Sequence, residues 1–128
     1  MRNGRHDPTP AEWAEAFRAK ALSAFRVAEA NWNSHPNSAA NRAYYAVFAA
    51  IQMRNGPSPR LPKDHRVLST SEVLVRLGLD QRDGNDLEAL YAMRHLADYS
   101  TRPVWPETAL QCVESARRLL VRLGTDVE

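Results

Sequence analysis

The chain has 128 residues, of which 44% are hydrophobic and 25% are charged, close to the average of a soluble globular domain. A chain of this length buries roughly two-thirds of its unfolded surface, so we expect one domain over residues 1–128 that folds without a metal or a disulfide. The composition excludes a collagen-like fibre, a disordered tail and a disulfide scaffold. A formal net charge of +2 does not by itself indicate a nucleic-acid binder.

The sequence also bears on location. The longest apolar run, residues 43–51, has nine residues, whereas a transmembrane helix needs ~20. The first ten residues contain no apolar segment of the kind found in secretory signals. Cys112 is the only cysteine, so an internal disulfide is excluded. We therefore expect a cytoplasmic protein without a membrane partner.

Helical periodicity begins near the N-terminus. Thr9 and Glu12 form a capping box around Pro10, which suits the first helical position, and predict a helix over residues 10–32. A second helix is expected to begin after the break at residues 35–38 and to end at Asn55–Gly56. It is apolar nearly all round, which predicts a central place in the fold.

Three further helices are predicted. The third is expected to begin near Asp64 or His65 and to end at Gly78, and the fourth to follow residues 83–85. After a loop over residues 99–106, the last helix is expected from Pro106 to Gly124. No segment alternates like a strand, so the predicted fold class is all-α, an antiparallel bundle of about five helices.

The sequence argues against metal and cofactor chemistry. The four histidines stand in separate segments, and no His-x-x-x-His, Cys-x-x-Cys or Glu-x-x-His spacing is present. No glycine-rich phosphate loop occurs either. Cys112 lies beside Val113 in an apolar helix and is expected to be a small buried hydrophobe. We expect no metal and no cofactor.

A polar cluster, R-H-L-A-D-Y-S-T-R, occupies residues 94–102. Arg94 and Asp98 are four residues apart and share a helix face. Tyr99 is about 140° away from Arg94 on an ideal helix, so the two converge only if the helix ends near Asp98. A helix end that carries an arginine, a carboxylate, a phenol and His95 has groups for binding phosphate and for moving protons.

A second cluster, N-R-A-Y-Y-A-V-F, occupies residues 41–48. Arg42 stands in an apolar stretch and needs either a partner or an opening to solvent. One reading is that its stem lies along the surface with the charge in water. The other places Arg42 and Tyr45 beside the Arg94 cluster, in a cleft between the second and fourth helices.

These clusters resemble a known family. The string N-R-A-Y-Y-A-V-F-A-A at residues 41–50 is similar to the S-R-A-Y-Y-A-x-F-x-A segment of small stand-alone HEPN-domain proteins of bacteria and archaea. The string R-H-L-A-D-Y at residues 94–99 resembles the R-x-x-A-D-Y segment of the same group, and K-D-H-R-V-L at residues 63–68 resembles its histidine-bearing start of helix three. The resemblance covers roughly residues 10–124.

The resemblance implies a helical bundle that forms a homodimer. Many HEPN proteins are metal-independent ribonucleases, often toxins paired with a nucleotidyltransferase antitoxin, and use an Arg-x(4–6)-His motif. Arg94 matches the arginine of that motif, but Tyr99, Ser100 and Thr101 stand where the histidine is expected. Imidazole transfers protons well near neutral pH, whereas a phenol is a weak base there.

Three hypotheses follow. In the first, the chain is a metal-independent ribonuclease or toxin component. In the second, it is a non-catalytic HEPN module that binds RNA, a nucleotide or a partner protein. In the third, the clusters only fix the second helix against the fourth, through a buried Arg42–Asp98 pair and hydrogen bonds of Arg94. The candidate residues are, for catalysis, Arg94, Asp98 and Tyr99, and for binding substrate or phosphate, Arg42, Tyr45, His65, His95 and Arg102.

Overall fold

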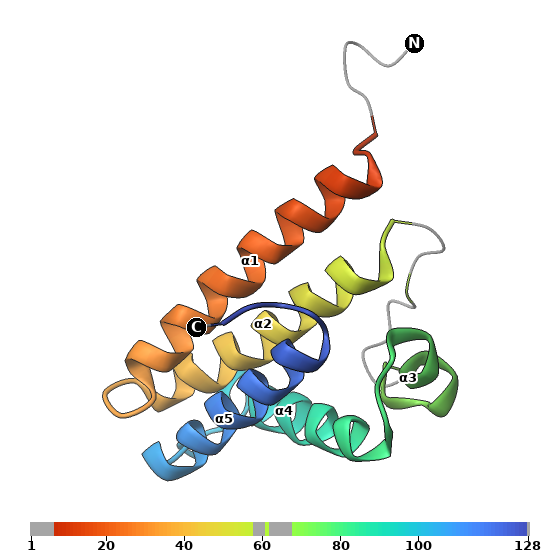
Figure 1. The fold of residues 1–128 in the computed structure, drawn as a ribbon. Coiled ribbons are helices and arrows are strands. Elements are labelled where there is room, and N and C mark those ends of the chain that lie inside the picture. The colour runs from red at the N-terminus through yellow and green to blue at the C-terminus, as the bar shows by residue number, and fades with distance from the viewer. Residues whose placement is uncertain (1–6, 58–60, 62–67, 128) are drawn as a thin grey trace.

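A computed structural model describes residues 7–57, 61 and 68–127. This part of the chain contains α-helices and no strand, which confirms the predicted all-α bundle (Figure 1). The helices are α1 (Pro10–Asn31), α2 (Pro36–Asn55), α3 (Ser71–Leu77), α4 (Gln81–Tyr99) and α5 (Pro106–Arg122).

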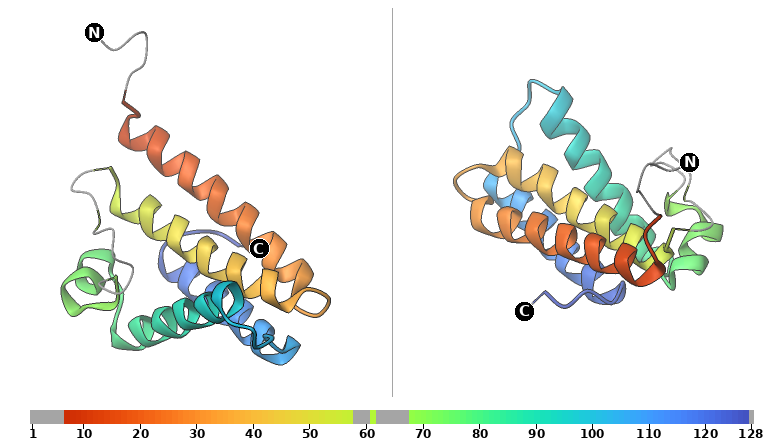
Figure 2. Two further views of the ribbon diagram at one scale, coloured as in Figure 1. Left: turned by 180° about the vertical axis from the view of Figure 1, so that it is seen from behind. Right: turned by 90° about the horizontal axis from the view of Figure 1, so that it is seen from above.

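Helix α2 is the centre of the bundle, as its composition predicts. It contacts each of the other four helices. Helix α1 lies alongside it in the opposite direction, whereas α4 and α5 cross it (Figure 2). Small side chains let these neighbours approach α2 closely. Its buried residues include Ala39, Ala40, Ala43, Ala46, Ala49 and Ala50.

The first two helices have the predicted ends. The Glu12 backbone N–H donates to Thr9 Oγ1 at 3.1 Å, and the Thr9 backbone N–H donates to Glu12 Oε1 at 2.8 Å, which is the expected capping box. Helix α2 begins at Pro36 and ends before Gly56, whose φ of 81° is open to glycine but strained for other residues. Local capping chemistry therefore defines the α1–α2 hairpin.

Helices α4 and α3 do not begin where the sequence predicted. Helix α4 begins at Gln81, not after residue 85, because Asp80 and Asp83 form a capping box one turn earlier. Gly84 thus lies inside the helix, where a Cβ would come within 2.7 Å of Leu74 Cδ1. Helix α3 begins at Ser71, after Thr70 with its extended backbone, so a continuous helix from residues 64–65 to Gly78 is wrong; residues 64–65 themselves lie outside the described residues.

The α4–α5 connection places the end of α4 beside the start of α2. Ser100 follows α4 with extended backbone, and the Val104 backbone N–H donates to Asn37 Oδ1 at 2.9 Å. Helix α5 begins at Pro106 as predicted, and Arg122 in its last turn pairs with Asp83 at 3.0 Å. None of the described helices is long and apolar enough to cross a bilayer.

Candidate functional site

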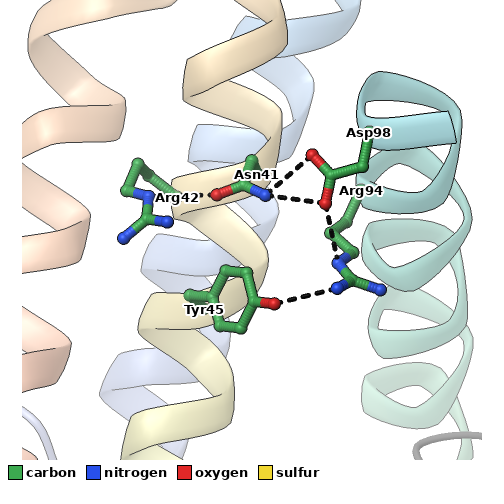
Figure 3. Close-up of polar contacts among 5 residues, drawn as sticks. All are labelled: Asn41, Arg42, Tyr45, Arg94 and Asp98. Carbon is green, nitrogen blue, oxygen red and sulfur yellow. Dashed lines mark hydrogen bonds and ion pairs between the residues drawn. The ribbon is translucent and has the colours of Figure 1, made fainter.

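The two clusters meet between α2 and the C-terminal half of α4. Asn41 and Tyr45 lie one helical turn apart on α2, and Arg94 and Asp98 lie one turn apart on α4. Figure 3 shows these four side chains pointing toward one another, with Arg42 attached at the edge. The predicted convergence of the second and fourth helices is therefore present, although its contacts differ from those expected.

Asn41 joins the two helices. Its Nδ2 donates to both carboxylate oxygens of Asp98, each at 2.9 Å, and its Oδ1 accepts from Arg42 Nε at 3.0 Å (Figure 3). A carboxylate only accepts and a guanidinium only donates, so the two neighbours fix the orientation of the amide. The expected direct pair between Arg42 and Asp98 is wrong, because Asn41 stands between them.

Arg94 is the most enclosed charge of the site. Its Nη2 donates to the Tyr45 hydroxyl at 2.8 Å, and its Nε lies 3.2 Å from Asp98 Oδ2. The second contact is an ion pair without hydrogen-bond geometry. Only 16% of the Arg94 side chain is exposed, against 28% of Asp98. Burial alone would lower the pKa of Arg94. The hydrogen bond to Tyr45 and the charge of Asp98 raise it by more than burial lowers it, so the pKa of Arg94 lies above its ordinary value.

The two adjacent tyrosines differ in role. Tyr44 is 1% exposed, and its ring packs edge-on against Tyr45 and Tyr91 at 5.7 and 5.6 Å. Burial raises the pKa of its phenol far above the usual range. Tyr45 is partly buried and carries the hydrogen bond to Arg94. The structure thus assigns Tyr44 to the core and Tyr45 to the site.

Tyr99 and His95 lie at the open edge of the site. Helix α4 ends at Tyr99, whose ring centroid is 5.6 Å from the Arg94 guanidinium carbon, so the two residues do converge. Tyr99 is 69% exposed, and its ring centroid lies 4.8 Å from that of His95. His95 projects to the next face of the helix, where Tyr91 is its other ring neighbour at 6.0 Å. The Tyr99 ring therefore lies between the two residues and contacts both the His95 ring and the Arg94 guanidinium.

Of the remaining predicted site residues that the structure describes, Arg42 joins this network through Asn41, whereas Arg102 does not. Arg42 contacts Asn41 but extends away from Arg94, toward α1 (Figure 3). Arg102 is exposed on the loop after α4, where its backbone N–H donates to Ser100 Oγ at 3.0 Å. His65 lies outside the described residues. Asn41 was not predicted as a site residue; its place one turn before Tyr45, on the same α2 face, is the sequence signal that could have indicated it.

The charges and donors of the site are suited to binding an anion. The cluster holds two guanidinium groups and one carboxylate, so one positive charge is in excess, although only Arg94 contacts Asp98 directly. Among the described residues the Arg94 nitrogen Nη1 makes no hydrogen bond or ion pair, and it points away from both Tyr45 and Asp98 (Figure 3). No three histidine, cysteine, aspartate or glutamate side chains gather into a metal-binding group in this part of the chain. Comparisons with family models, with curated proteins and with solved structures give no match.

Proposed function

We propose that the chain is a HEPN-type RNA-associated protein whose α2–α4 site binds a backbone phosphate of single-stranded RNA. The observation that carries this proposal is the position of Arg94: its guanidinium is held on two sides, by Asp98 and Tyr45, and keeps a terminal nitrogen for a ligand. A guanidinium fixed in this way loses little conformational entropy when it binds phosphate.

The surroundings of Arg94 suit RNA better than a bare phosphate ion. The exposed Tyr99 ring beside the guanidinium offers a face for stacking an unpaired base. Arg102, on the loop that follows, adds a second exposed charge for the neighbouring phosphate. In this proposal Asp98 positions Arg94 and does not act as a free base, since both its oxygens already accept from Asn41.

A second candidate is a metal-independent ribonuclease, favoured by the contact of Tyr99 with both Arg94 and His95. Cleavage requires that a base removes the proton of the ribose 2′-hydroxyl and that an acid protonates the departing 5′-oxygen. His95 and Tyr99 would supply these groups while Arg94 stabilises the charged phosphorus intermediate. The homodimer, the toxin role and a nucleotidyltransferase antitoxin remain predictions of the resemblance.

The test is binding of a fluorescent unstructured RNA, measured by anisotropy in EDTA. Replacing Arg94 by Gln should weaken binding roughly tenfold, as expected for one charge-assisted contact, and Arg94→Lys should restore part of it. Arg82→Gln is the matched control, because Arg82 is exposed on the same helix about 18 Å away. Equal binding by wild type and Arg94→Gln, with the fold intact by circular dichroism, would contradict the proposal.

The same samples separate binding from cleavage. RNA that stays intact during binding supports the binding module. Fragments that form in EDTA, and disappear in Arg94→Gln and Tyr99→Phe, would instead support the ribonuclease.

A further inference from the structure

A groove of about 600 Å³ lies between α1 and α2, and its residues, apart from Tyr45 and Arg42, are not part of the α2–α4 network. This volume is in the range of small-molecule sites. Most of its wall is apolar or aromatic, and α1 and α2 both contribute. The larger apolar and aromatic lining residues are Phe17, Val27, Tyr45 and Phe48, and the small ones are Ala19, Ala24 and Ala49.

The charges of the groove have one sign. Lys20 from α1 and Arg42 from α2 line it, and no aspartate or glutamate does. Neither cation has an acidic partner within the described residues; each lies over an aromatic ring instead, Lys20 Nζ at 4.8 Å from the Phe17 centroid and the Arg42 guanidinium carbon at 5.2 Å from the Tyr45 centroid. These contacts hold the cations against the wall without neutralising them.

A hydrogen bond to Asn41 also orients the Arg42 side chain. Its Nε donates to Asn41 Oδ1, so the terminal nitrogens are left to extend toward α1, as Figure 3 shows. The same residue therefore belongs to the α2–α4 network through Nε and to the groove through its end. This arrangement gives Arg42 a polar partner and an opening to solvent within the apolar stretch of α2.

We propose that this groove binds a small amphipathic anion, with a hydrophobic body against the aromatic wall and a carboxylate, sulfonate or phosphate between Lys20 and Arg42. Paired cations without acidic partners favour an anion over a neutral ligand. An apolar wall favours a hydrophobic body over an inorganic ion. The proposal does not rest on RNA binding, because the groove and Arg94 use different atoms.

Two matched probes test it: anilinonaphthalene sulfonate, an amphipathic anion, and phenylnaphthylamine, its uncharged counterpart. We expect the sulfonate to bind the native protein saturably, with one site by calorimetry. The double variant Lys20→Gln/Arg42→Gln should weaken sulfonate binding at least about tenfold and leave the neutral probe unchanged. Decanoate should compete with the sulfonate, whereas inorganic sulfate should not.

Three control variants locate the site. Ser23→Trp, at an exposed position of the groove wall, should abolish binding of both probes while the helical circular dichroism is retained. Arg82→Gln should leave both probes unchanged, and Lys20→Gln should leave RNA binding unchanged, which separates this proposal from the RNA site. Sulfonate binding that is absent, unaffected by the double variant, or lost together with that of the neutral probe would overturn the proposal.

Discussion

The contact between Asn41 and Asp98 gives the sharpest test of how α2 is fixed to α4. Asp98→Ala removes two hydrogen bonds of 2.9 Å and leaves the Arg94 guanidinium, 16% exposed, without its carboxylate. Hydrogen bonds to charged groups contribute about 1.5–3 kcal/mol, and the 28% exposure of Asp98 places this one toward the lower end. We expect a loss of about 2 kcal/mol in the free energy of unfolding.

Asn41→Ala should cost less, about 1 kcal/mol, because alanine is also a better helix former. That helix effect appears in both backgrounds of a double-mutant cycle and cancels from the coupling energy. The coupling between Asn41 and Asp98 should therefore be about 1 kcal/mol. The measurement is urea unfolding of the four proteins, followed by circular dichroism at 222 nm and extrapolated linearly.

The control cycle uses Gln81 and Asn85, which form an exposed hydrogen bond of 3.1 Å within α4. Its coupling should not exceed about 0.5 kcal/mol, as for other exposed helix pairs. A coupling below about 0.3 kcal/mol for Asn41 and Asp98 would refute the structural role of the contact.

Three other predictions test the packing and the charges of the bundle. Gly84→Ala should destabilise the protein by about 1 kcal/mol, although alanine has the better helix propensity, since the new Cβ meets buried Leu74. In a Leu74→Ala background the same change should stabilise the protein, and urea unfolding measures both effects. The hydrogen bond from the Asp83 backbone N–H holds the pKa of Asp80 below its ordinary value. The ionised Asp80 carboxylate therefore stabilises the fold above about pH 4, and this stabilisation is lost as the pH falls through the folded-state pKa. The difference in urea midpoint between wild type and Asp80→Asn should accordingly shrink from pH 7 to pH 3. Burial raises the pKa of the Cys112 thiol to about 11, so a thiol reagent at pH 8 should react at least roughly 100-fold faster in urea than with the native protein, and equal rates would contradict that burial.

Local sequence chemistry predicted most of the fold. Capping residues and glycine stops depend on a few neighbours in the chain, which is why the ends of the α1–α2 hairpin were predictable. The start of α4 was not, because residues 83–85 resemble a turn. Gly84 follows a tertiary demand, the close approach of Leu74, that no local pattern expresses.

The site was predictable in its location but not in its connections. Arg94 and Asp98 could be placed together because helical spacing sets which residues share a face, and one reading of the second cluster placed Tyr45 beside them. The link through Asn41 depends on the relative rotation of α2 and α4, which a single sequence does not define. The groove likewise depends on how α1 packs against α2, which brings the end of Arg42 to a wall that both helices form (Figure 3).

The central claim is that Arg94 binds an RNA phosphate, and the salt dependence of RNA binding tests it most directly. Each phosphate contact contributes about 0.7 to the slope of log K against log salt for a single strand. Wild type and Arg82→Gln should therefore show the same slope, and Arg94→Gln a slope smaller by about 0.7. Equal slopes for wild type and Arg94→Gln would show that Arg94 does not contact the RNA backbone.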